Sequence, residues 1–278
     1  MAAPSKVWIN GDEAEHISAT HRGFMYADGV FETLAVYSGR PLLLGRHMAR
    51  LQKGIQALSL QACVHTLEEE IRRVSRCVPA GARAALKLVV ARASQAGRGY
   101  RPTPGPKEAA DVVLTLSAWQ APTEPLKLML CNTILGSKPA LAGLKTLNAL
   151  EYVLASMELP DAWHEGVLCD TRGYIIEGTK SNIFWVDDRG VMVTPELGYC
   201  GIEGVVRQEL IARATARGIA VEETRAMAGS LLKAREIFLT NSLFGVLGVN
   251  EFQGRVFTQL PTVDYLKTLM SGVIFEAS

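Results

Sequence analysis

The periodic pattern of this 278-residue chain breaks at Trp119–Pro125, where two prolines stand in a stretch without apolar periodicity. On both sides of the break, short apolar strands run before and after isolated helices. This order is typical of α+β layers and argues against a doubly wound parallel sheet. We therefore predict an α+β fold with a smaller N-terminal α/β domain over residues 1–118, a linker over 119–125 and a larger C-terminal α+β domain over 126–278.

Apolar alternation and helical spacing predict the individual elements. In the first half we expect strands over 6–10, 29–37, 84–93 and 112–118, and helices over 45–60 and 66–78. In the second half we expect strands over 126–135, 166–170, 174–177, 182–186, 191–194, 237–240 and 244–250, and helices over about 144–158, 205–217 and 262–275.

Composition and charge exclude some classes of binding partner and indicate the cellular compartment. Hydrophobic residues make up 48% of the chain, enough for a large core, and 29 basic residues balance 28 acidic ones. Because neither sign forms a long run, we expect no nucleic-acid partner and no polybasic membrane surface. No apolar run reaches the ~20 residues of a membrane span, and the first residues lack a signal-peptide pattern. The five cysteines are scattered without a C-x-x-C pair, so we predict a reducing, cytoplasmic compartment and no metal site. We also expect a small-molecule substrate.

Lys145 stands in an apolar segment, Leu144-Lys145-Thr146-Leu147-Asn148. We predict that it opens the helix over about 144–158, whose apolar face carries Leu147, Leu150, Leu154 and Met157. A lysine in such surroundings has its ammonium form disfavoured by desolvation, which frees the amine to form a Schiff base. The alternative is a half-buried lysine whose charged head reaches water.

Glu177 ends a predicted strand beside Gly178, and Ser181 and Asn182 follow shortly after. In a functional role, Glu177 pairs with the ring nitrogen of a pyridine cofactor and keeps it protonated. The alternative is a solvated carboxylate at a strand end. Ser181 and Asn182 are candidates for holding the cofactor or, alternatively, ordinary turn residues.

A glycine turn, Gly201-Ile202-Glu203-Gly204, leads directly into the helix predicted from residue 205. The first N–H groups of a helix favour an anion, although a plain helix start fits this pattern equally well. Arg50, on the helix over 45–60, is the side chain that we pair with a phosphate at this place, because a guanidinium matches phosphate oxygens in a bidentate way. Lysine, carboxylate and helix N-terminus, in this order, are the parts needed to hold pyridoxal 5′-phosphate.

The chain resembles the fold-type IV pyridoxal-phosphate enzymes, which include D-amino-acid and branched-chain aminotransferases and aminodeoxychorismate lyases. The resemblance covers nearly the whole chain, and the segments that carry it are Ala27–Thr33, His47–Leu51, Glu177–Phe184, Met192–Thr194 and Ile202–Arg207. The resemblance implies a two-domain fold like that of D-amino-acid aminotransferase, and a homodimer with the cofactor between the two domains. It also implies Lys145 as the Schiff-base lysine, Glu177 at the pyridine nitrogen, and Arg50 with the backbone of Val205 and Val206 as phosphate ligands.

Within this family, three segments resemble those of aminodeoxychorismate lyases: Ala91–Tyr100 with its Gly-Arg-Gly-Tyr loop, Leu135–Asn148 and Thr240–Val246. The last segment implies that Asn241 lies near the phosphate. Val206 stands where D-amino-acid aminotransferases often have a threonine, which mildly favours the lyase. Ala149 stands where some lyases have an arginine, which is a departure from their pattern.

The resemblance therefore implies a carbon–oxygen lyase that eliminates pyruvate from 4-amino-4-deoxychorismate and forms p-aminobenzoate, a step of folate biosynthesis. The substrate has two carboxylates and needs a cationic site, for which Arg98 is our candidate, with a solvated loop arginine as the alternative. Lys145 or a nearby hydroxyl such as that of Thr33 is the candidate for proton transfer to the leaving group. The main alternative function is a class-IV aminotransferase acting on D-amino or branched-chain amino acids. A third hypothesis is a non-catalytic binding protein with the same fold.

Overall fold

We describe a computed structural model of the protein, which covers residues 6–94, 99–102, 110–120, 122 and 125–274. The chain divides into two compact units. Unit 1 contains Met1–Gln120 together with Leu144–Asn148, and unit 2 contains Ala121–Gly143 and Ala149–Ser278. The segment Leu144–Asn148, which belongs to the C-terminal half of the sequence, thus packs with the N-terminal unit.

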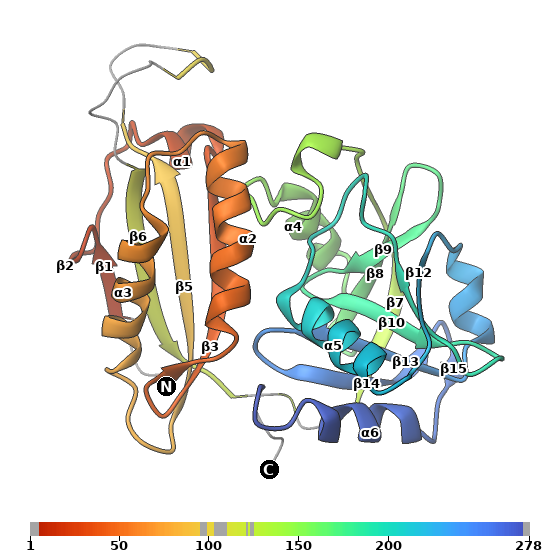
Figure 1. Cartoon of the computed structure of the whole chain (residues 1–278). Coiled ribbons are helices and arrows are strands. Elements are labelled where there is room, and N and C mark those ends of the chain that lie inside the picture. The colour runs from red at the N-terminus through yellow and green to blue at the C-terminus, as the bar shows by residue number, and fades with distance from the viewer. Residues whose placement is uncertain (1–5, 95–98, 103–109, 121, 123–124, 275–278) are drawn as a thin grey trace. The chain divides into compact units, whose positions relative to one another are not determined.

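Unit 1 is a layer of helices on an antiparallel sheet. Its strands are β1 (Lys6–Ile9), β2 (Asp12–Glu13), β3 (Gly29–Tyr37), β4 (Arg40–Pro41), β5 (Arg83–Arg92) and β6 (Ala110–Ala118), and its helices are α1 (Arg22–Tyr26), α2 (Leu44–Ala57) and α3 (Val64–Ser75). The six strands are ordered β2-β1-β6-β5-β3-β4. Helices α2 and α3, orange in Figure 1, pack on one face of this sheet against β3, β5 and β6.

The core of unit 1 lies between the sheet and these two helices. In β3, the side chains that face the helices alternate with those that face away, so Val30 and Leu34 are buried while Phe31 and Thr33 are partly exposed. Helix α2 contributes apolar residues at helical spacing, among them Leu51. Burying each large side chain of this kind contributes about 1.5–3 kcal/mol.

Unit 2 is built on a larger, mixed sheet. Its strands are β7 (Leu126–Leu135), β8 (Glu165–Asp170), β9 (Ile175–Gly178), β10 (Asn182–Val186), β11 (Met192–Pro195), β12 (Val221–Thr224), β13 (Glu236–Asn241), β14 (Gly245–Phe252) and β15 (Arg255–Val256). Its α-helices are α4 (Leu150–Met157), α5 (Val205–Ala216) and α6 (Pro261–Leu269), and short 3₁₀ helices cover Pro139–Leu141 and Ala228–Lys233.

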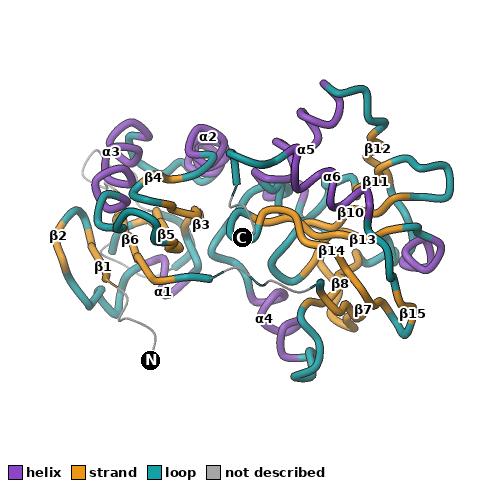
Figure 2. Tube along the Cα trace, turned by 90° about the horizontal axis from the view of Figure 1, so that it is seen from below, coloured by secondary structure: helices purple, strands orange, loops and turns teal. Residues whose placement is uncertain are grey.

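The nine-stranded sheet of unit 2 has the order β12-β11-β10-β13-β14-β7-β8-β9, with β15 paired to β14. The pairs β11–β12, β14–β7 and β7–β8 are parallel, and the other pairs are antiparallel. Strand β9 also contacts β10 and β11, so the sheet curls back on itself. Figure 2 shows α5 and α6 beside β13 and β14, while α4 packs against β7 and β8.

The predicted α+β fold is confirmed, and the long strands form close to their predicted positions. The helix predicted from residue 144 is wrong at its start, because α4 begins only at Leu150. Its apolar stripe is not core either: Leu150 and Leu154 are exposed, and Met157 is 77% exposed. Residues 144–148 lie outside this helix because their backbone pairs with β3.

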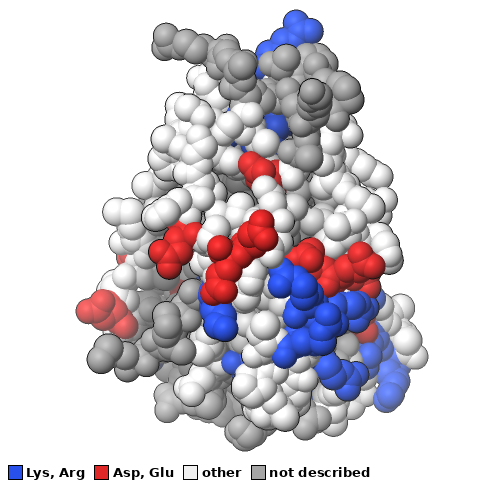
Figure 3. Space-filling model, turned by 90° about the vertical axis from the view of Figure 1, so that its left-hand side faces the viewer, with Lys and Arg blue, Asp and Glu red and all other residues white. Residues whose placement is uncertain are grey.

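The surface carries charges of both signs. On the face drawn in Figure 3, groups of basic and acidic side chains lie side by side, without a continuous surface of one sign. Helix α3 contributes such pairs, with Arg72 bonded to Glu68 and Arg73 to Glu70. No helix in the described part of the chain has the length and apolarity needed to cross a membrane.

A charged cluster lies inside unit 1, where α2 meets β3. Arg50 donates to both carboxylate oxygens of Glu32, at 2.8 and 2.5 Å, and His47 Nδ1 lies 2.7 Å from Glu32. Burial by itself raises the pKa of Glu32, but the field and hydrogen bonds of Arg50, with those of His47, lower this pKa to about 2. Burial lowers the pKa of His47, so its ring is neutral at pH 7.

The depressed pKa of Glu32 makes stability depend on pH. The unfolded chain protonates Glu32 near its ordinary value of 4.5, whereas the folded chain does so only at about 2. The stabilisation is therefore complete above pH 4.5 and is lost as the pH falls towards 2. In urea titrations between about pH 5 and pH 2, the free energy of unfolding should fall by about 3 kcal/mol more in the wild type than in Glu32→Gln. The control Glu68→Gln, at a surface ion pair, should follow the wild type. Parallel curves for wild type and Glu32→Gln would contradict this account.

Candidate functional site

Lys145 lies in an extended segment that pairs with the edge of β3. The Phe31 N–H donates to the Lys145 carbonyl at 2.9 Å, and the Leu147 N–H donates to the Gly29 carbonyl at 3.0 Å. Between these two bonds, Thr146 forms an antiparallel bridge with Val30. On this edge of β3, strand β4 reaches only Val36 and Tyr37, so the backbone groups of residues 29–31 bind the lysine segment. The lysine is held by strand pairing and not by a helix.

The pairing register directs the Lys145 side chain. Lys145 stands opposite Phe31, so the two side chains lie on the same face of the sheet. Lys145 Nζ lies 4.5 Å from the centre of the Phe31 ring. The turn that leads into the segment is formed by Gly143, whose φ of 79° strains any residue with a side chain. The charge of Lys145 also contributes to lowering the pKa of His47, after the larger effect of burial.

Two further predicted site residues, Thr33 and Arg50, lie in unit 1. Thr33 is on the same face of β3 as Phe31 and stands opposite Lys87 of β5. Arg50 is buried, with a bidentate bond to Glu32. Its guanidinium thus has a carboxylate partner inside unit 1, and its role as a phosphate ligand stays a prediction.

In unit 2, Glu177 is buried and surrounded by hydrogen-bond donors. Tyr152 Oη donates to its Oε1 at 2.6 Å, the Ile202 N–H lies 3.0 and 3.1 Å from its two oxygens, and Asn182 Nδ2 donates to Oε2 at 3.2 Å. These donors stabilise the carboxylate form. Burial, followed by the nearby charge of Glu177, raises the pKa of Tyr152, so its hydroxyl keeps its proton at physiological pH and donates.

The sequence analysis missed Tyr152. It lies on α4, between exposed apolar residues, and contacts Glu177 across 25 positions of sequence. No local pattern marks such a contact. In the sequence, Tyr152 lies within the apolar pattern of the predicted helix that also contains Leu150. That pattern indicates packing and does not indicate a hydrogen bond to Glu177.

Asn182 links Glu177 to the start of α5. Besides its bond to Glu177, its Nδ2 donates to the Ile202 carbonyl at 2.8 Å. A Cβ atom added at Gly204 would lie 1.8 Å from Asn182 Oδ1, so only glycine permits this close approach. Asn182 therefore acts in the described contacts as a brace that holds Glu177 and the turn before the helix together.

The N-terminus of α5 has features that favour an anion. Its N-cap residue, Gly204, has no side chain to accept the first N–H groups, and Val205 and Val206 are buried. Arg207 anchors this end of the helix, because its guanidinium donates to the Pro195 carbonyl at 2.9 Å and to Glu223 at 2.6 Å. The helix start is thus fixed against β11.

Hydroxyl and amide groups of the neighbouring strands complete this part of unit 2. Thr240 stands directly opposite Asn182 on β13, so both side chains lie on one face of the sheet. Its buried Oγ1 has no hydrogen-bond partner among the described residues. Ser181 is buried beside Glu165, whose pKa is raised by burial. Asn241 Oδ1 accepts from the backbone of Leu243 and Phe244 and thereby shapes the turn after β13.

These features of unit 2 fit the phosphate and ring of the predicted cofactor. A buried hydroxyl without a hydrogen-bond partner in the described part of the chain, an uncapped helix N-terminus and a turn that only glycine permits suit a phosphate, and Glu177 is a suitable partner for a protonated ring nitrogen. Lys145, in unit 1, has the nucleophilic group for the aldehyde. How the residues of the two units combine stays a prediction.

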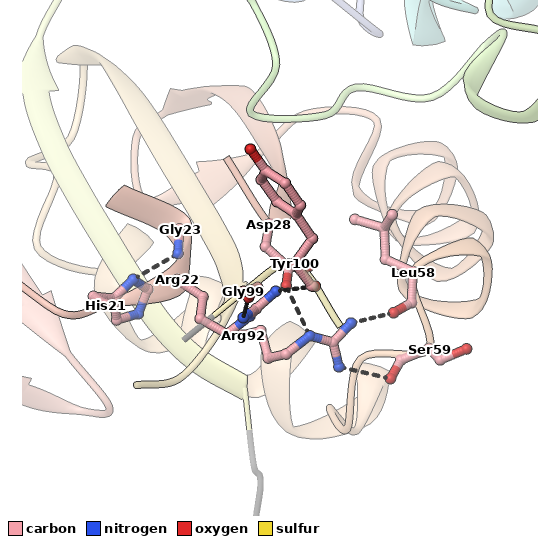
Figure 4. A network of polar contacts seen from close by, with 9 residues as sticks. All are labelled: His21, Arg22, Gly23, Asp28, Leu58, Ser59, Arg92, Gly99 and Tyr100. Carbon is pink, nitrogen blue, oxygen red and sulfur yellow. Dashed lines mark hydrogen bonds and ion pairs between the residues drawn. The ribbon is translucent and has the colours of Figure 1, made fainter. Parts of the chain in front are cut away.

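A polar network fixes the chain after β5 (Figure 4). Asp28 Oδ2 accepts from Arg22 Nε and Arg92 Nε, at 2.9 Å each. The other nitrogens of these two arginines donate to backbone carbonyls, those of Gly99 and Tyr100 for Arg22, and those of Ser59 and Leu58 for Arg92. Gly99 and Tyr100 are therefore tied to the residue that precedes β3.

Arg98, the predicted ligand of a substrate carboxylate, lies outside the described residues. Only its sequence neighbours Gly99 and Tyr100 are placed, through Arg22. The ring of Tyr100 meets that of Tyr26 edge to face, with 5.5 Å between the ring centres. The role of Arg98 stays a prediction.

Known proteins resemble this chain over most of its length. A family model described as amino-transferase class IV matches residues 29–252. An aminodeoxychorismate lyase of Vibrio harveyi is 30% identical over 87% of this chain and 90% of the relative. A putative branched-chain-amino-acid aminotransferase of Methanocaldococcus jannaschii is also 30% identical, over 95% of this chain and 93% of the relative. The crystal structure of 4-amino-4-deoxychorismate lyase from Pseudomonas aeruginosa has a TM-score of 0.87 and 35% identity, covering 97% of this chain and 100% of that one.

These matches confirm the predicted resemblance and its fold. Lyases and aminotransferases both occur among the relatives, so the comparison reaches the level of the family and leaves the reaction open. The predicted cofactor, pyridoxal 5′-phosphate, agrees with solved structures of the same fold, a branched-chain aminotransferase with pyridoxamine 5′-phosphate and a hypothetical aminotransferase in its PLP-bound form. The chain belongs to the class IV aminotransferase family of pyridoxal-phosphate enzymes.

Proposed function

We propose that the protein is an aminodeoxychorismate lyase, which converts 4-amino-4-deoxychorismate into p-aminobenzoate and pyruvate. The observation that carries this proposal is the 35% identity with the Pseudomonas aeruginosa lyase along 97% of the chain. The lyase-like segments Ala91–Tyr100, Leu135–Asn148 and Thr240–Val246 support it, because they border the residues that hold cofactor and substrate.

Lys145 carries the central chemistry in this proposal. Its Nζ holds the cofactor covalently before the substrate arrives and afterwards removes the proton at C4 of the substrate. The bound cofactor supplies an electron sink for the carbon that loses this proton. The strand pairing of residues 145–147 with β3 keeps the lysine backbone in one place, so only the side chain moves during proton transfer.

Glu177 keeps a proton on the pyridine nitrogen and so makes the ring electron-poor. Its three donors, from Tyr152, Asn182 and Ile202, hold the carboxylate charged and oriented. The phosphate is assigned to the backbone of Val205 and Val206, with Arg50, Ser181 and Asn241 as further ligands. The orphaned Thr240 hydroxyl joins this set as a candidate on geometric grounds.

After proton removal, the bond between the substrate ring and the enolpyruvyl oxygen breaks. Pyruvate leaves, and the ring becomes aromatic, which drives the reaction. Thr33 is the candidate donor to the leaving oxygen, since it lies on the same sheet face as Phe31 and Lys145. We assign the substrate carboxylates to cationic side chains, with Arg98 among them.

The second candidate function is an aminotransferase acting on D-amino or branched-chain amino acids. The 30% identity with the Methanocaldococcus jannaschii relative supports it. Lys145 and Glu177 serve in the same way in both reactions, and only the fate of the substrate after proton removal differs. From the family resemblance we also propose that the protein is cytoplasmic and forms a homodimer. Sedimentation of the cofactor-loaded protein at the mass of a monomer would contradict the dimer.

The lyase proposal is tested by product analysis. Wild-type protein loaded with pyridoxal phosphate should release p-aminobenzoate and pyruvate in equal amounts from 4-amino-4-deoxychorismate, without any keto acid. Lys145→Ala should form neither product, whereas Lys127→Met, at a partly exposed ion pair between β7 and β14, should behave as the wild type. Amino transfer that requires a keto acid, with no p-aminobenzoate formed, would establish the aminotransferase instead.

Gly204→Ala should weaken cofactor binding. The new Cβ atom would displace Asn182 from its bonds with Glu177 and Ile202. Because such hydrogen bonds involve a charged, buried carboxylate, we expect the dissociation constant for pyridoxal phosphate to rise about tenfold or more, measured by absorbance titration of the cofactor-free protein. Gly229→Ala is the matched control, since nothing lies within 4 Å of its added Cβ. Equal affinities for the two variants would argue against the brace.

Tyr152→Phe should lower turnover about tenfold while cofactor loading stays complete, because it removes one donor from the charged Glu177. The raised pKa of Tyr152 means that this hydroxyl still donates in mildly alkaline solution, so the wild-type rate should not fall with loss of its proton up to pH 10. Tyr265→Phe, at an exposed tyrosine of α6, is the control. A Tyr152→Phe variant with wild-type turnover would show that the Glu177 charge needs no such donor.

A further inference from the structure

Lys87 lies on the same sheet face as Lys145. In the register of β3 and β5, Thr33 stands opposite Lys87, and Phe31 stands opposite Val89. Side chains directly opposite each other share a face, and residues two apart in a strand do so as well. Lys145, paired with Phe31 on the other edge of β3, completes the set. Phe31, Thr33, Lys87 and Lys145 therefore share the face that lies away from α2 and α3.

Two ammonium groups converge on one aromatic ring. Lys145 Nζ lies 4.5 Å and Lys87 Nζ 4.9 Å from the centre of the Phe31 ring. The backbones of the two lysines flank β3 on opposite sides, two strand spacings or about 10 Å apart. Both long side chains thus reach inward over the same residue. Each gains a modest cation–π attraction there, and the two positive charges repel each other.

An anion above Phe31 relieves this repulsion. In the described part of the chain, no carboxylate forms an ion pair with Lys87, and its side chain is exposed to solvent. Its polar neighbours by register are the side chains of Thr33 on β3 and Thr115 on β6, neither of which carries a charge. In the proposed reaction Lys145 serves the cofactor and the proton at C4, so Lys87 is the basic side chain beside Phe31 that remains for the substrate.

We propose that Lys87 binds the ring carboxylate of the substrate, so that the substrate ring spans Phe31 from Lys145 to Lys87. This inference rests on the proposed lyase function and names the specificity-determining residue of that site. The substrate amine, at C4, must be at the Lys145 end because the proton is removed there. The ring carboxylate is para to this amine, on the far side of the ring, whereas the enolpyruvyl oxygen is on the carbon next to C4. A cation on the opposite flank of β3 therefore matches the para carboxylate.

This assignment also accounts for product binding. p-Aminobenzoate keeps the amine and the ring carboxylate but has lost the enolpyruvyl group. A residue that holds the ring carboxylate contacts both substrate and product, while a residue that holds the enolpyruvyl carboxylate contacts the substrate alone. Binding of p-aminobenzoate therefore reports on Lys87 without any turnover.

The test compares Lys87→Met with wild type, Lys87→Arg and the control Lys127→Met, all loaded with pyridoxal phosphate. We expect Lys87→Met to raise both the KM for 4-amino-4-deoxychorismate and the dissociation constant for p-aminobenzoate by about tenfold to a hundredfold. The kcat should change less than threefold, and the absorbance of the bound cofactor should be unchanged. Lys87→Arg, which keeps the cation, should recover most of the affinity, and Lys127→Met should match the wild type.

Two results would overturn the assignment. If Lys87→Met binds p-aminobenzoate as tightly as the wild type does, Lys87 does not hold the ring carboxylate. If Lys87→Arg is as weak as Lys87→Met, the loss reflects the shape of the side chain and not its charge. Wild-type protein that forms no p-aminobenzoate at all would refute the lyase function itself, a result that is separate from the comparison of variants.

Discussion

The site depends on the backbone pairing between residues 145–147 and the start of β3. Two hydrogen bonds, which together form the antiparallel bridge between Val30 and Thr146, bind this segment to an edge that the short β4 leaves open. An unpaired strand edge is a template for another strand, and here it is used to place a reactive lysine. A shift of one residue in this register would turn Lys145 to the helix side of the sheet, away from Phe31 and Thr33. The register of this pairing therefore determines which face of the sheet carries the Lys145 amine.

The second requirement is a buried carboxylate whose charged form is stabilised by hydrogen-bond donors. Glu177 meets this requirement because Tyr152, Asn182 and the Ile202 backbone all donate to it. The same asparagine braces the turn before α5, and the absence of a side chain at Gly204 makes room for it. One set of contacts thus holds both the Glu177 carboxylate and the N-terminus of α5. In our proposal the carboxylate binds the ring nitrogen of the cofactor and the helix N-terminus binds its phosphate.

Much of the fold was predictable from local pattern, and the failures have physical causes. The alternation in β3 and the helical spacing in α2 are long enough to be decisive. The spacing of Leu147, Leu150 and Leu154 suggested a buried helix at Lys145, but strand pairing with β3 competes for its first residues, and the stripe is exposed. Lys145, Glu177 and the helix start at Gly204 were found because each carries its own local signal. Tyr152 and Lys87 were not, because their roles depend on contacts across 25 positions and on the register of two strands, neither of which leaves a trace in the local sequence.

The central claim is that the Lys145 amine, held at the edge of β3, binds pyridoxal phosphate covalently. The most direct measurement is reduction of the loaded protein with borohydride, followed by digestion and mass spectrometry of the peptides. The account predicts that the reduced cofactor is found on the peptide that contains Lys145 and on no other. Its presence on the peptide that contains Lys87, or its absence from every lysine, would contradict the account.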